Sequence, residues 1–217
     1  VDLEIKADGT PISSVLEVIS VDVRAEAGRV PECRIVFSDG SPAEMEFPLT
    51  DASTFKPGVA VTVGAFFGAD PPGMLFEGIV VAERLRLTTQ GSRLEVICRC
   101  DAIKLTQVRR TSVHLAKKDS DVISAIAGAA GLSASVDSVK TGPHDQVQNA
   151  CTDWDFLRLL ADRNGLMLTT AGKKLSAKAF DASAAAVHTL TFGTDIEAFD
   201  AEVSAAPALS AAKGRAW

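Results

Sequence analysis

Three histidines, four cysteines and two closely spaced aspartates are the residues of this chain whose types and spacing could do chemistry. The histidines His114, His144 and His188 lie far apart in the sequence and have no spacing typical of metal ligands. The sequence contains no G-x-S-x-G, H-E-x-x-H, P-loop or G-x-G-x-x-G motif. We therefore predict no catalytic, cofactor-binding or metal-binding residues and no enzymatic activity. An enzyme whose catalytic groups meet only in the fold stays open as an alternative, because triads are built from distant residues.

The cysteines Cys33, Cys98, Cys100 and Cys151 lack the spacing of a zinc finger. Cys98 and Cys100 are two positions apart, so in a strand their side chains point to the same side. We expect thiols that are buried as small hydrophobic groups. A disulfide framework is unusual in a chain of 217 residues, so the pattern predicts reduced thiols and a cytoplasmic protein.

Asp153 and Asp155 could be interpreted as paired carboxylates for acid–base catalysis. On a helix, however, positions two apart point about 200° away from each other. Thr152 followed by Asp155 fits a capping box, and acidic side chains are favoured in the first turn of a helix. The sequence therefore predicts a structural role for both aspartates, with Trp154 between them packed in the core.

Two helices are predicted in the second half of the chain. Apolar residues recur at helical spacing over 120–131, with Asp119 or Ser120 as the N-cap and Gly131 at the position of a C′ glycine. The second helix begins after Thr152 and ends at Asn164-Gly165. We also expect an ion pair between Arg158 and Asp162.

The first hundred residues are typical of strands separated by turns. Val59, Val61, Val63 and Ala65 lie on one face of a strand, and Leu94, Val96 and Cys98 share one face of a later strand. The alternation changes phase inside Met74–Thr88, with Phe76, Gly78 and Val80 inward first and Leu85 and Leu87 inward later, which predicts a bulge or a bend. We expect a compact antiparallel barrel or sandwich over about residues 1–105. Further on, Gly172-Lys173 indicates a hairpin, and Val187–Val203 is strand-like.

Composition and charge argue against several classes of function. Lys and Arg number 22 against 28 Asp and Glu, for a net charge of −6, and the tight basic clusters are no larger than pairs such as Arg109-Arg110 and Lys117-Lys118. A groove for nucleic acid is therefore not expected. With ten Phe, two Trp and no Tyr, there is little material for a base- or sugar-stacking surface. The sequence has no apolar run near the ~20 residues of a membrane span, and Val1-Asp2-Leu3-Glu4 lacks the basic start of a signal peptide, so we expect no membrane insertion.

From residue 76 onward, the order of motifs resembles the valine-glycine repeat (VgrG) spike proteins of type VI secretion and the tail hubs of contractile phages. The F-x-G-x-V strand, Cys98-Arg99-Cys100-Asp101 and the 120–131 helix carry the first part of this resemblance. The most specific element is Asp153-Trp154-Asp155-Phe156-Leu157, followed by a leucine-rich turn and Gly165. The similarity is strongest over about residues 74–180.

The resemblance implies a β-rich α+β fold with two tandem, related β-barrel-like modules and two helices inserted between them. It places a first barrel module at 1–110, a helical insert at 111–165 and part of a second barrel module at 166–217. It also implies a homotrimer that adapts a spike to a tube and baseplate, with the tail tube, baseplate and needle proteins as partners. Such a component is assembled in the cytoplasm and then forms part of a phage tail or injection particle. The family's oligonucleotide-binding-like domain and β-helical needle are not in this sequence, so we expect a fragment, a split-gene version or a short hub whose needle is a separate polypeptide.

One alternative from a different class is a free-standing β-barrel that binds a small ligand. Ala65, Cys98 and Cys100 are small inward residues that could leave room for one. The discriminating observation is whether the inward faces fill one another or line a pocket.

Overall fold

The computed structural model describes residues 2–13, 15–41, 45–68, 71–89 and 91–203, together with 211 and 213. The chain divides into two compact units, Val1–Phe180 and Asp181–Trp217. All helices and strands of the described residues belong to the first unit.

The predicted strand character of Val187–Val203 is wrong. The second unit forms only an isolated bridge between Phe192 and Ile196 in its described part. Both Val187 and Phe199 are exposed there. Alternating apolar residues make a strand only when a neighbouring strand pairs with the backbone, and the described residues supply none.

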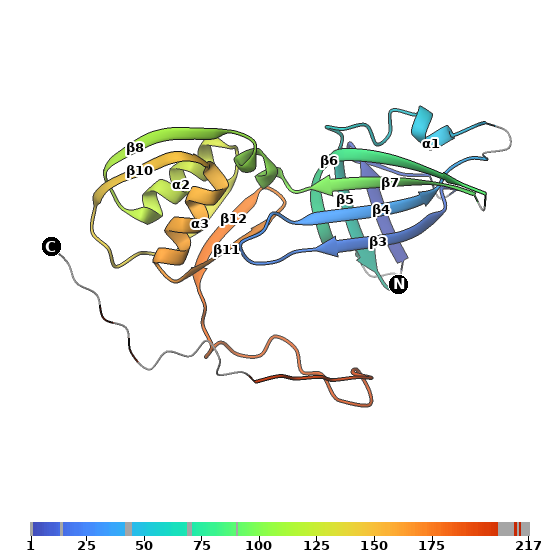
Figure 1. The fold of residues 1–217 in the computed structure, drawn as a ribbon. Helices are drawn as coiled ribbons and strands as arrows, with labels where there is room; N and C mark the ends of the chain where they lie inside the picture. The colour runs from blue at the N-terminus through green and yellow to red at the C-terminus, as the bar shows by residue number, and fades with distance from the viewer. Residues whose placement is uncertain are drawn as a thin grey trace. The chain divides into compact units, whose positions relative to one another are not determined.

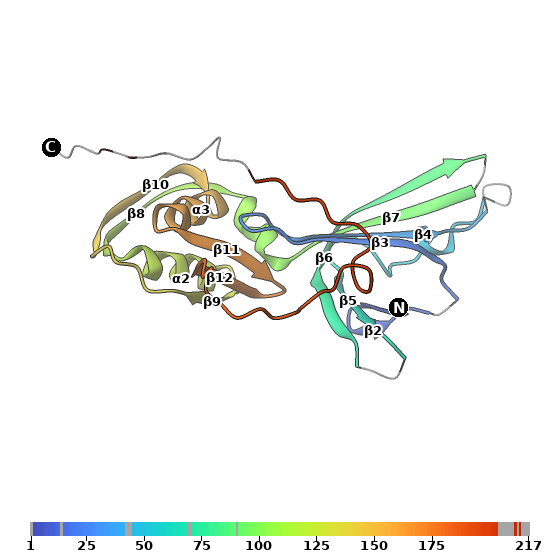
Figure 2. The same cartoon turned by 90° about the horizontal axis from the view of Figure 1, so that it is seen from below.

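The first half of the first unit is a seven-stranded antiparallel sheet in the order β2-β1-β5-β6-β7-β4-β3 (Figures 1 and 2). No described pair joins the two edge strands, so the predicted barrel is observed as an open sheet and the coarser β-rich α+β class is confirmed. A one-turn helix lies between β4 and β5, and a 3-10 helix follows β7. The bounds of these elements are β1 (Asp2–Ala7), β2 (Thr10–Pro11), β3 (Val18–Arg24), β4 (Glu32–Ser38), α1 (Pro48–Asp51), β5 (Ala60–Phe66), β6 (Gly73–Thr88), β7 (Gly91–Arg99) and η1 (Asp101–Thr106).

Alternation along the strands builds the core of this sheet, as predicted. Val61 and Val63 of β5 and Leu94 and Val96 of β7 are fully buried. The predicted phase change in β6 is a bulge between Val80 and Ala82. The prediction that Leu87 points inward is wrong, because this end of β6 runs past the core and leaves Leu87 51% exposed.

Position 78 of β6 requires a glycine because the backbone of a neighbouring strand approaches it closely, and not because the chain turns there. A Cβ at this position would overlap the carbonyl group of Arg99 and lie 2.7 Å from the Phe76 ring. We expect Gly78→Ala to lower the free energy of unfolding by about 1–3 kcal/mol, the usual cost of overpacking. Urea unfolding measures this effect. The matched control is Gly128→Ala in a helix, where the added Cβ meets nothing within 4 Å. This substitution is expected to raise the free energy of unfolding by about 0.5–1 kcal/mol. Equal effects of the two substitutions would contradict this packing.

The second half of the first unit contains two helices and two small sheets. Strands β8 and β10 form a two-stranded antiparallel ribbon, and β11-β12-β9 form a three-stranded sheet with a parallel β12–β9 pair. The helices α2 and α3 contact both sheets, and Figure 1 shows the ribbon running along one side of the helix pair. The bounds are β8 (Arg109–Lys117), α2 (Asp119–Ala129), β9 (Ser133–Val136), β10 (His144–Thr152), α3 (Asp153–Arg163), β11 (Leu166–Ala171) and β12 (Lys174–Ala179).

The helix ends follow the predicted local rules, with one correction. Thr152 is the N-cap of α3, and its Oγ1 accepts a hydrogen bond of 3.1 Å from the Asp155 amide. Gly131, with φ +79°, follows α2, and the Leu132 amide reaches back to the Ala127 carbonyl at 3.0 Å. The prediction that Asp119 or Ser120 caps α2 is wrong. Lys118 occupies the N-cap without a side-chain bond, because Asp119 lies inside the first turn and faces the interior.

Candidate functional site

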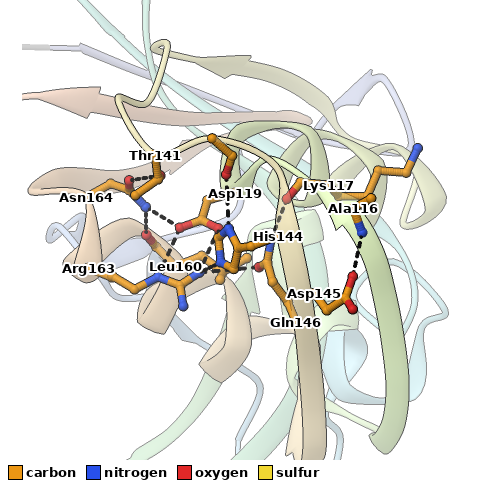
Figure 3. A network of polar contacts seen from close by, with 11 residues as sticks. Ala116, Lys117, Asp119, Thr141, His144, Asp145, Gln146, Leu160, Arg163 and Asn164 are labelled. Atoms are coloured by element: carbon orange, nitrogen blue, oxygen red, sulfur yellow. Dashed lines mark hydrogen bonds and ion pairs between the residues drawn. The ribbon is translucent and has the colours of Figure 1, made fainter. Parts of the chain in front are cut away.

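A buried polar network joins the start of α2 to the end of α3 (Figure 3). Asp119 is fully buried, and its carboxylate accepts two hydrogen bonds from Arg163, at 3.0 Å from Nε and 2.6 Å from Nη2. Asn164 Nδ2 donates a third at 2.6 Å. Burial alone would raise the pKa of Asp119, but the hydrogen bonds and the charge of Arg163 outweigh it and hold the pKa below its ordinary value. The site is therefore a structural clamp between two helices.

His144 completes this network from β10. Its Nδ1 lies 3.1 Å from the Gly142 carbonyl oxygen, and its Nε2 lies 3.3 Å from Arg163 Nη2. A carbonyl oxygen only accepts, so Nδ1 is the donor of the contact with Gly142. Nε2 also lies 3.5 Å from Asp119 Oδ1, so the imidazole faces both members of the Asp119–Arg163 pair.

His114 and Ser112 of β8 lie in a cleft of about 490 Å³ together with Gln148 and Asp153. Ser112 Oγ is 3.3 Å from His114 Nε2 and donates its proton to Gln148 Oε1 at 3.1 Å. The His114 ring stacks on Phe156, with centroids 5.7 Å apart. Over the described residues no carboxylate contacts His114, so a histidine lies within reach of a serine but the third member of a triad is not assembled.

The two aspartates of α3 point to different partners, as the helix geometry predicts. Asp153 lies 3.3 Å from Arg110 and accepts a hydrogen bond of 2.9 Å from Gln148. Asp155 contacts Thr152 at 2.7 Å. They form no carboxylate pair. His188, in the second unit, is exposed.

In the described ranges, no group of three or more His, Cys, Asp or Glu side chains is placed to hold a metal ion. No helix of those ranges is long and apolar enough to cross a membrane.

The ribbon of β8 and β10 reverses the usual pattern of a half-buried sheet, because its buried face is polar and its exposed face is apolar. Its inner face carries Gln146 and Gln148, which are 5% and 1% exposed and bind backbone carbonyls or Asp153. Its outer face carries the apolar side chains Val113, Leu115 and Val147, each more than half exposed. Sequence reasoning missed both strands, because the buried positions of β10 carry glutamines and its exposed position 147 carries a valine, so no apolar period-2 pattern indicates the strand.

The predicted ion pair between Arg158 and Asp162 is wrong. Arg158 instead lies against Gly28 in the loop between β3 and β4, where a Cβ added to Gly28 would be 3.5 Å from Arg158 Nε. The loop is held there by a hydrogen bond of 2.7 Å from the Gly28 amide to the Leu168 carbonyl. Gly28 and Arg158 are 130 positions apart, so no local pattern indicates this contact.

The four cysteines are free thiols, and Cys33, Cys98 and Cys100 are buried. Burial raises the pKa of Cys33 and of Cys98 to about 12, so both stay protonated at neutral pH. We expect a thiol reagent to modify only the half-buried Cys151 readily in the native protein. Denaturation without a reductant should release four titratable thiols, and a lower count would contradict this assignment.

Residues 1–217 match the family model described as Alg8 N-terminal domain. No curated protein sequence matches the chain.

Among solved structures, the 43 kDa tail protein of prophage MuSo2 from Shewanella oneidensis matches 82% of this chain and 53% of its own, with a TM-score of 0.64 and 13% identity. The tail protein from Neisseria meningitidis MC58 matches 90% of this chain and 55% of its own, with a TM-score of 0.64 and 14% identity.

The Escherichia coli c3393 protein is described as a component of the type VI secretion system with structural similarity to the T4 bacteriophage tail proteins gp27 and gp5. It matches 80% of this chain and 48% of its own, with a TM-score of 0.57 and 12% identity. The chain thus spans about half the length of these proteins. Its predicted resemblance to VgrG-like spike and tail hub proteins is confirmed for the fold.

Proposed function

We propose from its fold, which is that of phage tail and type VI secretion proteins, that this chain of the Alg8 N-terminal domain family is a structural component of a contractile injection apparatus. The observation that carries the proposal is the likeness in fold, which extends over 80–90% of the chain in three tail and secretion proteins. The component works mechanically at the tip of the tail tube and is driven outward when the sheath contracts. It has no catalytic role.

Within this function we propose a homotrimeric hub that adapts a spike to the tube and baseplate. The outer face of the β8–β10 ribbon supports an assembled state, because Val113 and Val147 are opposite each other in the ladder and leave an apolar surface open to water. Contiguous exposed apolar side chains of this kind mark interaction surfaces. The tail tube, baseplate and needle or spike proteins are the proposed partners, and nucleic acid is not one.

The proposed domain organisation follows the family resemblance: a first barrel-like module at 1–110, a helical insert at 111–165 and part of a second barrel-like module at 166–217. The seven-stranded sheet and the hairpin of β11 and β12 lie in the first and last of these segments. The protein is assembled in the cytoplasm and then becomes part of a tail or injection particle. Reduced thiols support the cytoplasmic step.

Packing of the sheet supports the structural role over a ligand-binding barrel. Phe37 stacks on Phe55, with ring centroids 4.9 Å apart, and Ile35 beside them has no exposed surface. At these positions the inward faces fill one another, while Cys100 lines a cleft of about 260 Å³ with Phe76 and Thr170. A barrel that binds a ligand keeps an interior cavity open to solvent.

The solution mass tests the trimer. Light scattering across a concentration series is expected to give about three times the 22.7 kDa of one chain, with a mass that persists on dilution. A monomer at every concentration would contradict the trimeric hub.

A further inference from the structure

A cavity of about 480 Å³ lies where the β3–β4 loop, η1 and α3 meet. Four arginines from separate places in the chain line it, together with two glutamates: Arg24, Arg29, Arg99, Arg158, Glu26 and Glu32. Four cationic side chains against two anionic ones make its lining positive, in a protein whose net charge is −6. This local excess of positive charge is the opposite of the chain's overall balance.

Three of the arginines are already matched by carboxylates. Arg24 contacts Asp22 at 3.2 Å, and Arg29 contacts Glu26 at 3.2 Å. Arg99 forms an ion pair with Glu32. Arg158 differs, because it has no ion pair or hydrogen bond with any residue that the structure describes. The cavity therefore holds one guanidinium whose five N–H donors are free.

The surroundings of Arg158 fix its place. Gly28, with φ +71°, forms the tip of the loop against which Arg158 lies, and this tip is tied to β11 through the Leu168 carbonyl. Trp154 lies one helical turn before Arg158 and lines the same cavity. Its indole N–H has no hydrogen-bond partner in the described parts of the chain. A guanidinium and an indole donor are thus held together at one wall.

We propose that this cavity binds the carboxylate of an aspartate or glutamate side chain in an acidic segment of a partner protein. The planar guanidinium of Arg158 receives the carboxylate through two parallel hydrogen bonds, and the indole N–H of Trp154 is a further donor. Glu26 and Glu32 in the lining limit the net positive charge, which suits a single carboxylate better than a run of phosphates. The inference does not depend on the trimer and is tested by a different observable.

Isothermal titration calorimetry on the full chain tests this site. The probes are the capped peptides acetyl-Ala-Glu-Glu-Ala-amide and acetyl-Ala-Gln-Gln-Ala-amide, with inorganic phosphate as a third. We expect the glutamate peptide to bind, the glutamine peptide to bind at least about tenfold more weakly, and 0.5 M NaCl to weaken binding. Arg158→Gln should weaken the glutamate peptide by about tenfold or more, as loss of a charge-assisted hydrogen bond does.

The matched control is Arg86→Gln, an exposed arginine of β6 that does not line the cavity, and it should bind the peptide as the unaltered chain does. Circular dichroism melts establish that both variants are folded. Equal affinity for the two peptides, an unchanged affinity of Arg158→Gln, or binding of phosphate in place of the glutamate peptide would each overturn the proposal. Because peptide binding and solution mass are measured separately, a failure here leaves the trimer prediction standing, and the reverse also holds.

Discussion

Replacing Asp119 by alanine is expected to lower the free energy of unfolding by about 1.5–3 kcal/mol, because it removes the acceptor of the hydrogen bonds that Arg163 and Asn164 donate to a buried carboxylate. The carboxylate is fully buried and accepts three hydrogen bonds from Arg163 and Asn164. Urea unfolding measures the change. The matched control is Asp121→Ala, which removes an exposed aspartate from the same first turn of α2 and should cost at most about 1 kcal/mol. Similar losses in the two variants would show that the clamp does not stabilise the fold.

The same network predicts a dependence on pH. The pKa of Asp119 lies below its ordinary value of 3.8, so the unfolded chain binds its proton first as the pH falls. Its stabilising contribution is therefore complete above pH 3.8 and is lost as the pH falls through the lowered pKa. Asp119→Asn cannot titrate, so the difference in unfolding free energy between it and the unaltered chain should be constant near neutral pH and shrink in acid. A constant difference down to pH 2 would contradict the assignment.

Replacing Trp154 by alanine is the second change with a large expected effect. The indole is 5% exposed and belongs to the core that joins α3 to the sheets. Its loss is expected to lower the free energy of unfolding by about 3–5 kcal/mol through lost packing and the cavity left behind. Leu159→Ala on the same helix is the control, because Leu159 is 58% exposed and should change stability by about 0.5 kcal/mol or less. A nearly unchanged melting temperature of the Trp154 variant would contradict this packing. It would show instead that the indole is a surface contact that belongs to an assembly interface.

Features fixed by neighbouring residues could be predicted from the sequence. The Thr152 cap, the glycine after α2 and the bulge in β6 each depend on a few adjacent residues, and the structure confirms all three. Local rules also explain why Asp153 and Asp155 diverge. The hub-like fold was recognised from the order of such short motifs.

Features fixed by contacts between distant segments could not be predicted in this way. Asp119 meets Arg163 across 44 positions, and an acidic residue before a helical pattern indicates a cap equally well. Arg158 had a suitable local partner in Asp162, yet the loop at Gly28 gives it another position. The inverted ribbon was missed because buried Gln146 and Gln148 reverse the usual relation between polarity and burial.

Electron microscopy of intact injection particles labelled with a gold-conjugated antibody against this chain tests the central claim most directly. The account predicts label at a single end of the tail tube, where the spike joins the baseplate. Particles without label, with the chain recovered only as free protein, would contradict a structural role in the apparatus.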